Sequence, residues 1–397
     1  DEKAKNVDKN LMYMEKIKTR NRGIFYRNTI MLLMAIALVL PLVSGCKEDS
    51  TVAPRPRVEP KEETGKIALN NANIHVMGVQ YVYRTPEKLS FKRFSDATLD
   101  MSNDVRRFSV TNALATTGIS IQFKTKSSLI NMTFTPESGM TDRGSFKVLK
   151  DGVDFKTIPF SGPVSQPIQI ELNDLPTDKE HVYEIILPCY TNVSLTKLEL
   201  DAESSLMAYT PAPKGGVYIS FGDSITHGAR QEGATYLTYP YLLAQKLDMR
   251  LYNLAVAGAR ISMPMAETAK DLPKADIITV LIGYNDFASA NRTASQIERD
   301  YRSFLTEIRN NQPSAEIYCI TLLYTTNTLN TTTGLVPDDV RNVIKDIVTE
   351  YQTTDSKLHL IEGNQIITSS AQLADQVHLN VSGASLLADG LYERITK

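Results

Sequence analysis

The sequence predicts two domains of different fold class, an all-β sandwich followed by an α/β domain built around a parallel sheet. Three observations support this division. Short segments with alternating apolar and polar side chains fill residues 67–207, whereas residues 217–397 contain apolar runs separated by helix-like segments. Residues 208–216 lie between these regions and are rich in proline and glycine, which is typical of a linker.

The prediction of the first domain rests on strand periodicity. Apolar side chains recur at every second position in residues 119–123, 130–134 and 168–172. This period is typical of half-buried strands, and Asp151-Gly152 between two further apolar segments indicates a tight hairpin. Many short strands at such spacing predict a jelly-roll-like β-sandwich over residues 67–207.

A sandwich of this size could bind carbohydrate or could only shape the cleft of its neighbour. Flat sugar-binding surfaces favour aromatic side chains, and the chain contains no tryptophan. A sugar platform would therefore depend on Tyr81, Tyr83 or Tyr183. We prefer the interpretation that the domain shapes the cleft.

The second domain shows a regular alternation of strand and helix patterns. The apolar runs, which we expect to be buried strands, are residues 217–221, 251–256, 277–282, 317–323 and 358–361. The helix candidates are residues 239–247, 294–310, 338–351 and 382–395. This alternation predicts a parallel sheet with helices on both faces, and such sheets bind ligands at the carboxyl ends of their strands.

A serine follows the first of these strands. The letters GDS at residues 222–224 predict a tight turn that presents the Ser224 hydroxyl. A serine hydroxyl needs a neighbouring base, and the base needs an acceptor to orient it. His378 is the best candidate base because Asp375 precedes it by three residues in a loop. His227 is the alternative base, but its only acidic neighbour is Asp223, and we interpret it as part of the pocket wall.

Four motifs of this domain together resemble the four blocks of the SGNH hydrolases, also called GDSL esterases. They are GDS at 222–224, LAVAG at 254–258, GYND at 283–286 and DQVH at 375–378. Ser224, Gly258, Asn285 and His378 match the residues that name the family. The resemblance implies a flavodoxin-like α/β hydrolase domain over 217–397 and hydrolysis of an ester by Ser224.

The same resemblance assigns an oxyanion hole. It is made by the backbone N–H groups of Ser224 and Gly258 and by the side-chain amide of Asn285. His378 is expected to act as the base and Asp375 to orient it, although some relatives of this type use a backbone carbonyl in place of the acid. No metal or organic cofactor is implied.

The order of the two domains is similar to that of carbohydrate esterases. It implies removal of acyl groups, O-acetyl above all, from a polysaccharide or oligosaccharide through an acyl-enzyme intermediate. Two alternatives remain open. One is a lysophospholipase or thioesterase of the same family, which needs an apolar groove for the acyl tail. The other is a glycan-binding surface lipoprotein without catalytic activity.

The start of the chain predicts export and lipid anchoring. Basic side chains precede an apolar run at residues 30–43, which is shorter than the roughly 20 residues of a membrane span. The run ends in LVSGC at residues 42–46, which resembles a bacterial lipobox with Cys46 as the lipidated residue; a signal anchor is the alternative. We therefore expect a signal region over 1–46, a flexible tether over 47–66, and attachment to an outer membrane, at the cell surface if the acidic residues after Cys46 direct export.

Composition excludes some partners. The formal net charge of −2 argues against the basic surface that nucleic-acid binding requires. Cys189 and Cys319 lie in apolar runs of different domains and predict two buried free thiols rather than a disulfide. No Cys/His cluster has the spacing of metal ligands, and the sequence does not indicate an oligomeric state.

Overall fold

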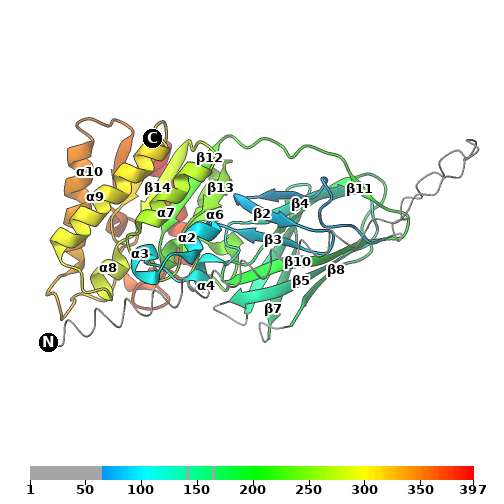
Figure 1. Cartoon of the computed structure of the whole chain (residues 1–397), viewed down its shortest axis with the longest axis horizontal. Coiled ribbons are helices and arrows are strands. Elements are labelled where there is room, and N and C mark those ends of the chain that lie inside the picture. Colours follow the sequence, from blue (N-terminus) through cyan, green and yellow to red (C-terminus); the bar gives the residue numbers. More distant parts are fainter. Residues whose placement is uncertain (1–64, 140–142, 163–165) are drawn as a thin grey trace, which may run out of the picture. The chain divides into compact units, whose positions relative to one another are not determined.

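The computed structural model describes residues 65–139, 143–162 and 166–397 (Figure 1). The predicted signal region with Cys46, and the predicted tether up to residue 64, lie outside the described residues. Lys66 forms an isolated β-bridge with Glu199, so the fold begins just before the predicted domain boundary. Among the residues that the structure describes, no helix is long and apolar enough to cross a membrane.

The N-terminal domain consists of two antiparallel sheets that share one hydrophobic core. In order across the first sheet are β1 (His75–Met77), β4 (Ser120–Thr125), β9 (His181–Ile186), β6 (Arg143–Lys150) and β7 (Val153–Ser161), with β11 (Leu206–Met207) also beside β4. The second sheet runs β2 (Tyr81–Arg84), β3 (Leu89–Lys92), β10 (Thr191–Leu200), β5 (Ile130–Gly139) and β8 (Ile168–Leu172). Phe134 of one sheet packs on Phe146 of the other with ring centroids 4.8 Å apart.

The hairpin at Asp151-Gly152 joins β6 to β7 as expected. Lys150 pairs with Val153, so the loop contains only two residues. Asp151 and Gly152 adopt φ values of 52° and 78°. Two successive left-handed residues are characteristic of the type I′ turn, whose twist matches that of the flanking strands.

The all-β expectation for residues 67–207 is wrong in one segment. Three short helices, α2 (Asp96–Asp100), α3 (Asn103–Arg106) and α4 (Val110–Ala113), interrupt the strands. A serine precedes each helix, and the Ser95 hydroxyl accepts a hydrogen bond from the Thr98 amide at 3.1 Å. Phe94, Leu99 and Phe108 join the core of the α/β domain. We call residues 93–113 the helical segment; it binds the two domains together.

The predicted parallel sheet of the α/β domain is confirmed. Its order is β13 (Arg250–Asn253), β12 (Val217–Gly222), β14 (Ile277–Leu281), β15 (Glu316–Ile320) and β16 (Leu358–Ile361), and every pair is parallel. Strands β13 and β15 end three residues earlier than their apolar runs, because residues 254–256 and 321–323 continue as buried loops. The apolar side chains of such buried turns cannot be distinguished from those of a buried strand by their pattern in the sequence.

Helices cover both faces of this sheet, as predicted (Figure 1). One face packs against α7 (Met263–Glu267), α9 (Ala294–Asn311) and α10 (Pro337–Tyr351), and the other against α6 (Tyr239–Lys246) and α11 (Val381–Ile395). Short 3-10 turns occur at Thr235–Leu237, Thr268–Asp271, Gly363–Gln365 and Ser370–Gln372. Cys189 and Cys319 are buried free thiols, as the sequence predicted.

Candidate active site

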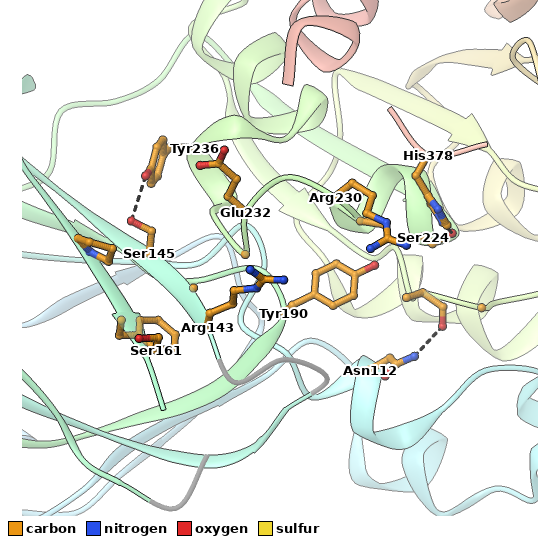
Figure 2. A pocket seen from close by; sticks show the side chains of 18 of the residues that line it. Asn112, Arg143, Ser145, Ser161, Tyr190, Ser224, Arg230, Glu232, Tyr236 and His378 are labelled. Carbon is orange, nitrogen blue, oxygen red and sulfur yellow. Dashed lines mark hydrogen bonds between the residues drawn. The ribbon is translucent and has the colours of Figure 1, made fainter. Parts of the chain in front are cut away.

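A pocket of about 1090 Å³ opens where the carboxyl ends of β12, β13 and β14 meet. Its walls come from both domains (Figure 2). Among the residues of the α/β domain that line it are Ser224, Arg230, Glu232, Tyr236, Gly258, Asn285 and His378. Those of the N-terminal domain include Asn112, Arg143, Ser145, Phe160 and Tyr190. The sequence motifs thus meet in one cavity, together with side chains that no motif indicated.

The turn after β12 places the Ser224 side chain in this pocket. Asp223 is the N-cap of the short helix α5 (Ser224–His227), and its carboxylate accepts a hydrogen bond from the Ile225 amide at 3.1 Å. A Cβ atom at Gly222 would lie 2.1 Å from the Thr226 hydroxyl oxygen, so this close turn requires glycine. Burial raises the pKa of Asp223 to about 7.

Ser224, His378 and Asp375 form one chain of hydrogen bonds. The Nε2 atom of His378 lies 2.9 Å from Ser224 Oγ, and its Nδ1 atom lies 3.0 and 2.9 Å from the two carboxylate oxygens of Asp375. The loop before α11 makes this possible because Asp375 Oδ1 also accepts the amides of Val377 and His378, at 3.1 and 2.9 Å. The three side chains therefore have the arrangement of a nucleophile, a base and an acid that orients the base.

The charge state of Asp375 suits such a role. Burial alone would raise the pKa of this carboxyl, but hydrogen bonds from the backbone and ring of His378, from the Val377 amide and from Arg230 together outweigh burial and hold the pKa well below its usual range. An ionised Asp375 keeps the proton of the imidazole on Nδ1. The Nε2 atom is then free to accept the proton of Ser224.

Arg230 was not among the predicted site residues. Its Nε atom donates to Asp375 Oδ2 at 2.9 Å, and its side chain is largely exposed. Arg230 and Glu232 have φ values of 66° and 53°, an uncommon left-handed conformation for residues other than glycine. The loop that carries them is held against the N-terminal domain by a β-bridge between Pro188 and Ala234. Local sequence patterns contain no signal for this contact.

The predicted oxyanion-hole residues line the same pocket as Ser224. Gly258 follows β13 with φ of 77°, and a Cβ atom there would meet nothing within 4 Å. Asn285 lies in α8 (Tyr284–Ala288) and donates one amide hydrogen to Ala259 O at 3.0 Å. The neighbouring Asp286 accepts from the Ile261 amide at 2.9 Å and so ties α8 to the loop after β13. Burial raises the pKa of Asp286 to about 6.

His227 is not part of the pocket wall, contrary to our interpretation of the sequence. It is fully buried, its ring stacks on Tyr190 with centroids 4.4 Å apart, and Tyr190 supplies the wall instead. Its Nδ1 accepts the Ala257 amide at 2.9 Å, so Nε2 must carry the proton and donate to Cys189 O at 2.7 Å. Both ring nitrogens are engaged, which leaves none to act as a base for Ser224.

The N-terminal domain also reaches the loop after β13. Asn112 of the helical segment donates to Ala257 O at 2.8 Å, as the dashed line at Asn112 in Figure 2 shows. Tyr236 donates to Ser145 at 3.0 Å on the far side of the pocket. Across the described ranges, no group of three or more His, Cys, Asp or Glu side chains lies together as metal ligands would.

Residues 220–386 match the model of the GDSL-like lipase/acylhydrolase family. A salicylyl-acyltransferase from a tetracycline biosynthetic pathway is similar in structure, with 18% identity, a TM-score of 0.73, and coverage of 85% of this chain and 98% of that one. A putative GDSL-like lipase from Bacteroides ovatus has 18% identity and a TM-score of 0.63 over 82% and 95% of the two chains.

An acetyl xylan esterase from the rumen bacterium Butyrivibrio proteoclasticus is more distant. It shares 13% identity with a TM-score of 0.55, over 83% of this chain and 97% of that one. Identities this low establish a common fold and leave the substrate open. No curated protein is significantly similar to the chain in sequence.

Proposed function

Because the chain belongs to the SGNH family of GDSL-like lipases and acylhydrolases, and is therefore a carboxylic ester hydrolase, we propose that it removes O-acetyl groups from a polysaccharide or oligosaccharide. The observation that carries the proposal is the series of hydrogen bonds from Ser224 through His378 to Asp375. Ser224 and His378 line a pocket whose walls come from both domains. The N-terminal domain, which we infer to be a jelly-roll-like sandwich, would then shape the cleft.

The geometry suggests the order of proton transfers. Ser224 Oγ attacks the acyl carbonyl while its proton passes to His378 Nε2, 2.9 Å away. Asp375 stabilises the resulting imidazolium, which then protonates the departing sugar hydroxyl. Water, deprotonated by the same imidazole, releases acetate from Ser224. No step requires a metal or organic cofactor.

The oxyanion formed in each step needs preorganised donors. Ser224 and Gly258 can supply backbone N–H groups, and all three candidate residues line one cavity. The Asn285 side chain has two amide hydrogens, of which one is bonded to Ala259 O, and the second can donate to the oxyanion. Loss of one such donor typically lowers kcat by about 10²–10³-fold.

The character of the pocket supports a glycan substrate. Several lining side chains can exchange hydrogen bonds with sugar hydroxyls, namely Arg143, Ser145, Ser161, Glu232 and Tyr236. The aromatic rings of Phe160 and Tyr190 line the pocket beside them and could pack on a sugar face. The likeness to an acetyl xylan esterase fold agrees with this substrate class.

The experiment is a comparison of acetate release from acetylated xylan and from 4-nitrophenyl acetate by the protein and its Ser224→Ala variant. Serine-dependent release from both substrates is expected. Release from the aryl ester alone would keep the serine mechanism and favour a lysophospholipase or thioesterase. A protein that is silent on both but binds glycan equally well with and without Ser224 would be the non-catalytic lipoprotein.

We also propose that Cys46 is lipidated and anchors the protein to an outer membrane, at the cell surface. The support is the lipobox-like sequence alone. Labelling of cells with a clickable palmitate should mark the protein, and Cys46→Ala should abolish the label. A label that persists in Cys46→Ala would contradict this anchor.

A further inference from the structure

We propose that Asn112, a side chain of the N-terminal domain, is a positioning residue for the oxyanion hole. Its amide fixes the peptide group between Ala257 and Gly258, whose N–H is one of the three candidate oxyanion donors. This inference rests on the proposed function, because it assumes that Gly258 N–H stabilises the oxyanion. It assigns to the N-terminal domain a part in the reaction itself, through geometry rather than substrate contact.

The argument begins with the planarity of the peptide bond. Asn112 Nδ2 donates to Ala257 O at 2.8 Å, and the described residues contain no cis peptide. In a trans peptide the C=O and N–H groups point in opposite directions. An amide that holds the Ala257 carbonyl on one side therefore aims the Gly258 N–H to the other. The same hydrogen bond polarises the peptide and strengthens its N–H as a donor.

This peptide needs an external support. Gly258 has φ of 77°, and glycine adopts positive and negative φ with similar ease. A Cβ atom at Gly258 would touch nothing within 4 Å. The hydrogen bond that closes this turn, from the Ala259 amide to Val256 O at 3.0 Å, does not involve the 257–258 peptide. The preceding peptide is held separately, since the Ala257 amide donates to His227 Nδ1 at 2.9 Å. Without Asn112 the 257–258 peptide could rotate and turn its N–H away from Ser224.

Asn112 is itself held rigidly. It lies in α4 and is only 9% exposed, so little water competes for its hydrogen bond. Arg93, buried at the start of the helical segment, donates to the Asn112 carbonyl at 3.0 Å and to the carbonyls of Asn253 and Ala255 at 2.9 and 2.6 Å. One guanidinium thus ties α4 to the same loop that carries Gly258. The positions of Asn112 and Gly258 are therefore fixed relative to each other.

The test uses two variants with different shapes. Asn112→Ala removes the side chain, and Asn112→Leu fills the same space without a donor. Each should lower kcat for 4-nitrophenyl acetate about 10- to 100-fold with little change in KM, because a misaimed donor affects the transition state and not the ground state. Phenylboronic acid, which forms a tetrahedral anion on an active-site serine, should bind more weakly by a similar factor.

Gln312 provides a matched control. Its amide, on a side chain 3% exposed, also donates to a backbone carbonyl, that of Ala269 at 2.8 Å, away from the pocket. Gln312→Ala should lower the thermal midpoint and leave kcat and boronate affinity unchanged. A merely structural role for Asn112 would give the same pattern as Gln312.

The outcomes separate this inference from the proposed function. A wild-type protein that neither hydrolyses esters nor reacts with a fluorophosphonate at Ser224 would refute the proposed function. An active wild type whose folded Asn112→Ala and Asn112→Leu variants keep kcat and boronate affinity within twofold would refute the role of Asn112 alone. Should neither variant fold, the isosteric Asn112→Asp, which cannot donate when ionised, decides by the same two measurements.

Discussion

Replacement of Asp375 by asparagine tests the order of the proposed catalytic groups most directly. The side-chain oxygen of asparagine can still accept the amides of Val377 and His378, which now bond Asp375 Oδ1. The NH2 group then occupies the position of Oδ2, where His378 Nδ1 and Arg230 Nε both donate at 2.9 Å. Two donors would meet a third at this position. The remaining acceptor, the asparagine oxygen, lies 3.0 Å from His378 Nδ1 but already accepts two backbone amides, so the tautomer with the proton on Nε2 is favoured.

That tautomer cannot accept the proton of Ser224, 2.9 Å away. The equivalent substitution in a serine protease triad lowers kcat about 10⁴-fold. At about 1.36 kcal/mol for each factor of ten, this is roughly 5 kcal/mol of transition-state stabilisation. We expect a loss of about 10³–10⁴-fold in kcat for 4-nitrophenyl acetate at pH 8, with a folded protein by circular dichroism.

Asp286→Asn is the matched control. Asp286 is a second aspartate beside the pocket, more deeply buried than Asp375, and its hydrogen bond from the Ile261 amide can be kept by the asparagine oxygen. Its kcat should stay within tenfold of wild type. Equal losses in the two variants would remove Asp375 from the reaction and point to a backbone carbonyl as the group that orients His378.

Three further predictions concern neighbouring groups. Burial raises the pKa of Asp223 to about 7, so its contribution to stability is full below about pH 4 and declines as the pH rises towards 7. In urea unfolding, the free energy of unfolding of Asp223→Asn should therefore rise relative to that of wild type between pH 4 and 7, by at most about 4 kcal/mol. A difference between the two proteins that does not vary with pH would contradict this prediction. Burial holds the pKa of His227 well below its ordinary value, so the unfolded chain takes up a proton below about pH 6.5 that the folded chain does not. His227→Phe should be less stable than wild type at pH 8, and the gap should narrow at pH 5; a constant gap would show that His227 does not titrate on unfolding. Arg230 is 62% exposed, so Arg230→Ala should lower kcat/KM less than tenfold, and the difference should shrink in 0.5 M NaCl. A loss as large as that of Asp375→Asn would instead make Arg230 part of the catalytic machinery.

The two departures from the sequence predictions have different causes. The helical segment was missed because α2, α3 and α4 are four or five residues long, too short to show a helical period. His227 was interpreted as part of the pocket wall because its only acidic neighbour in the sequence is Asp223, yet the turn of α5 points its ring into the domain boundary. Serines before each short helix were the available signal for the first error, and nothing local signalled the second.

The apolar runs and the four motifs were enough to predict the parallel sheet and the place where the motifs meet. Buried strands form long apolar runs, and the carboxyl ends of parallel strands share one edge, so Ser224, Gly258 and Asn285 had to converge. Which groups surround these residues depends on how distant parts of the chain pack together. Asn112 and Ala257 are 145 residues apart and meet only when the two domains pack. Arg230 and Asp375, also 145 residues apart, meet only when the α/β domain folds. The periodicity of apolar residues shows which side of a helix or strand is buried, but it does not show which distant side chain packs against that side.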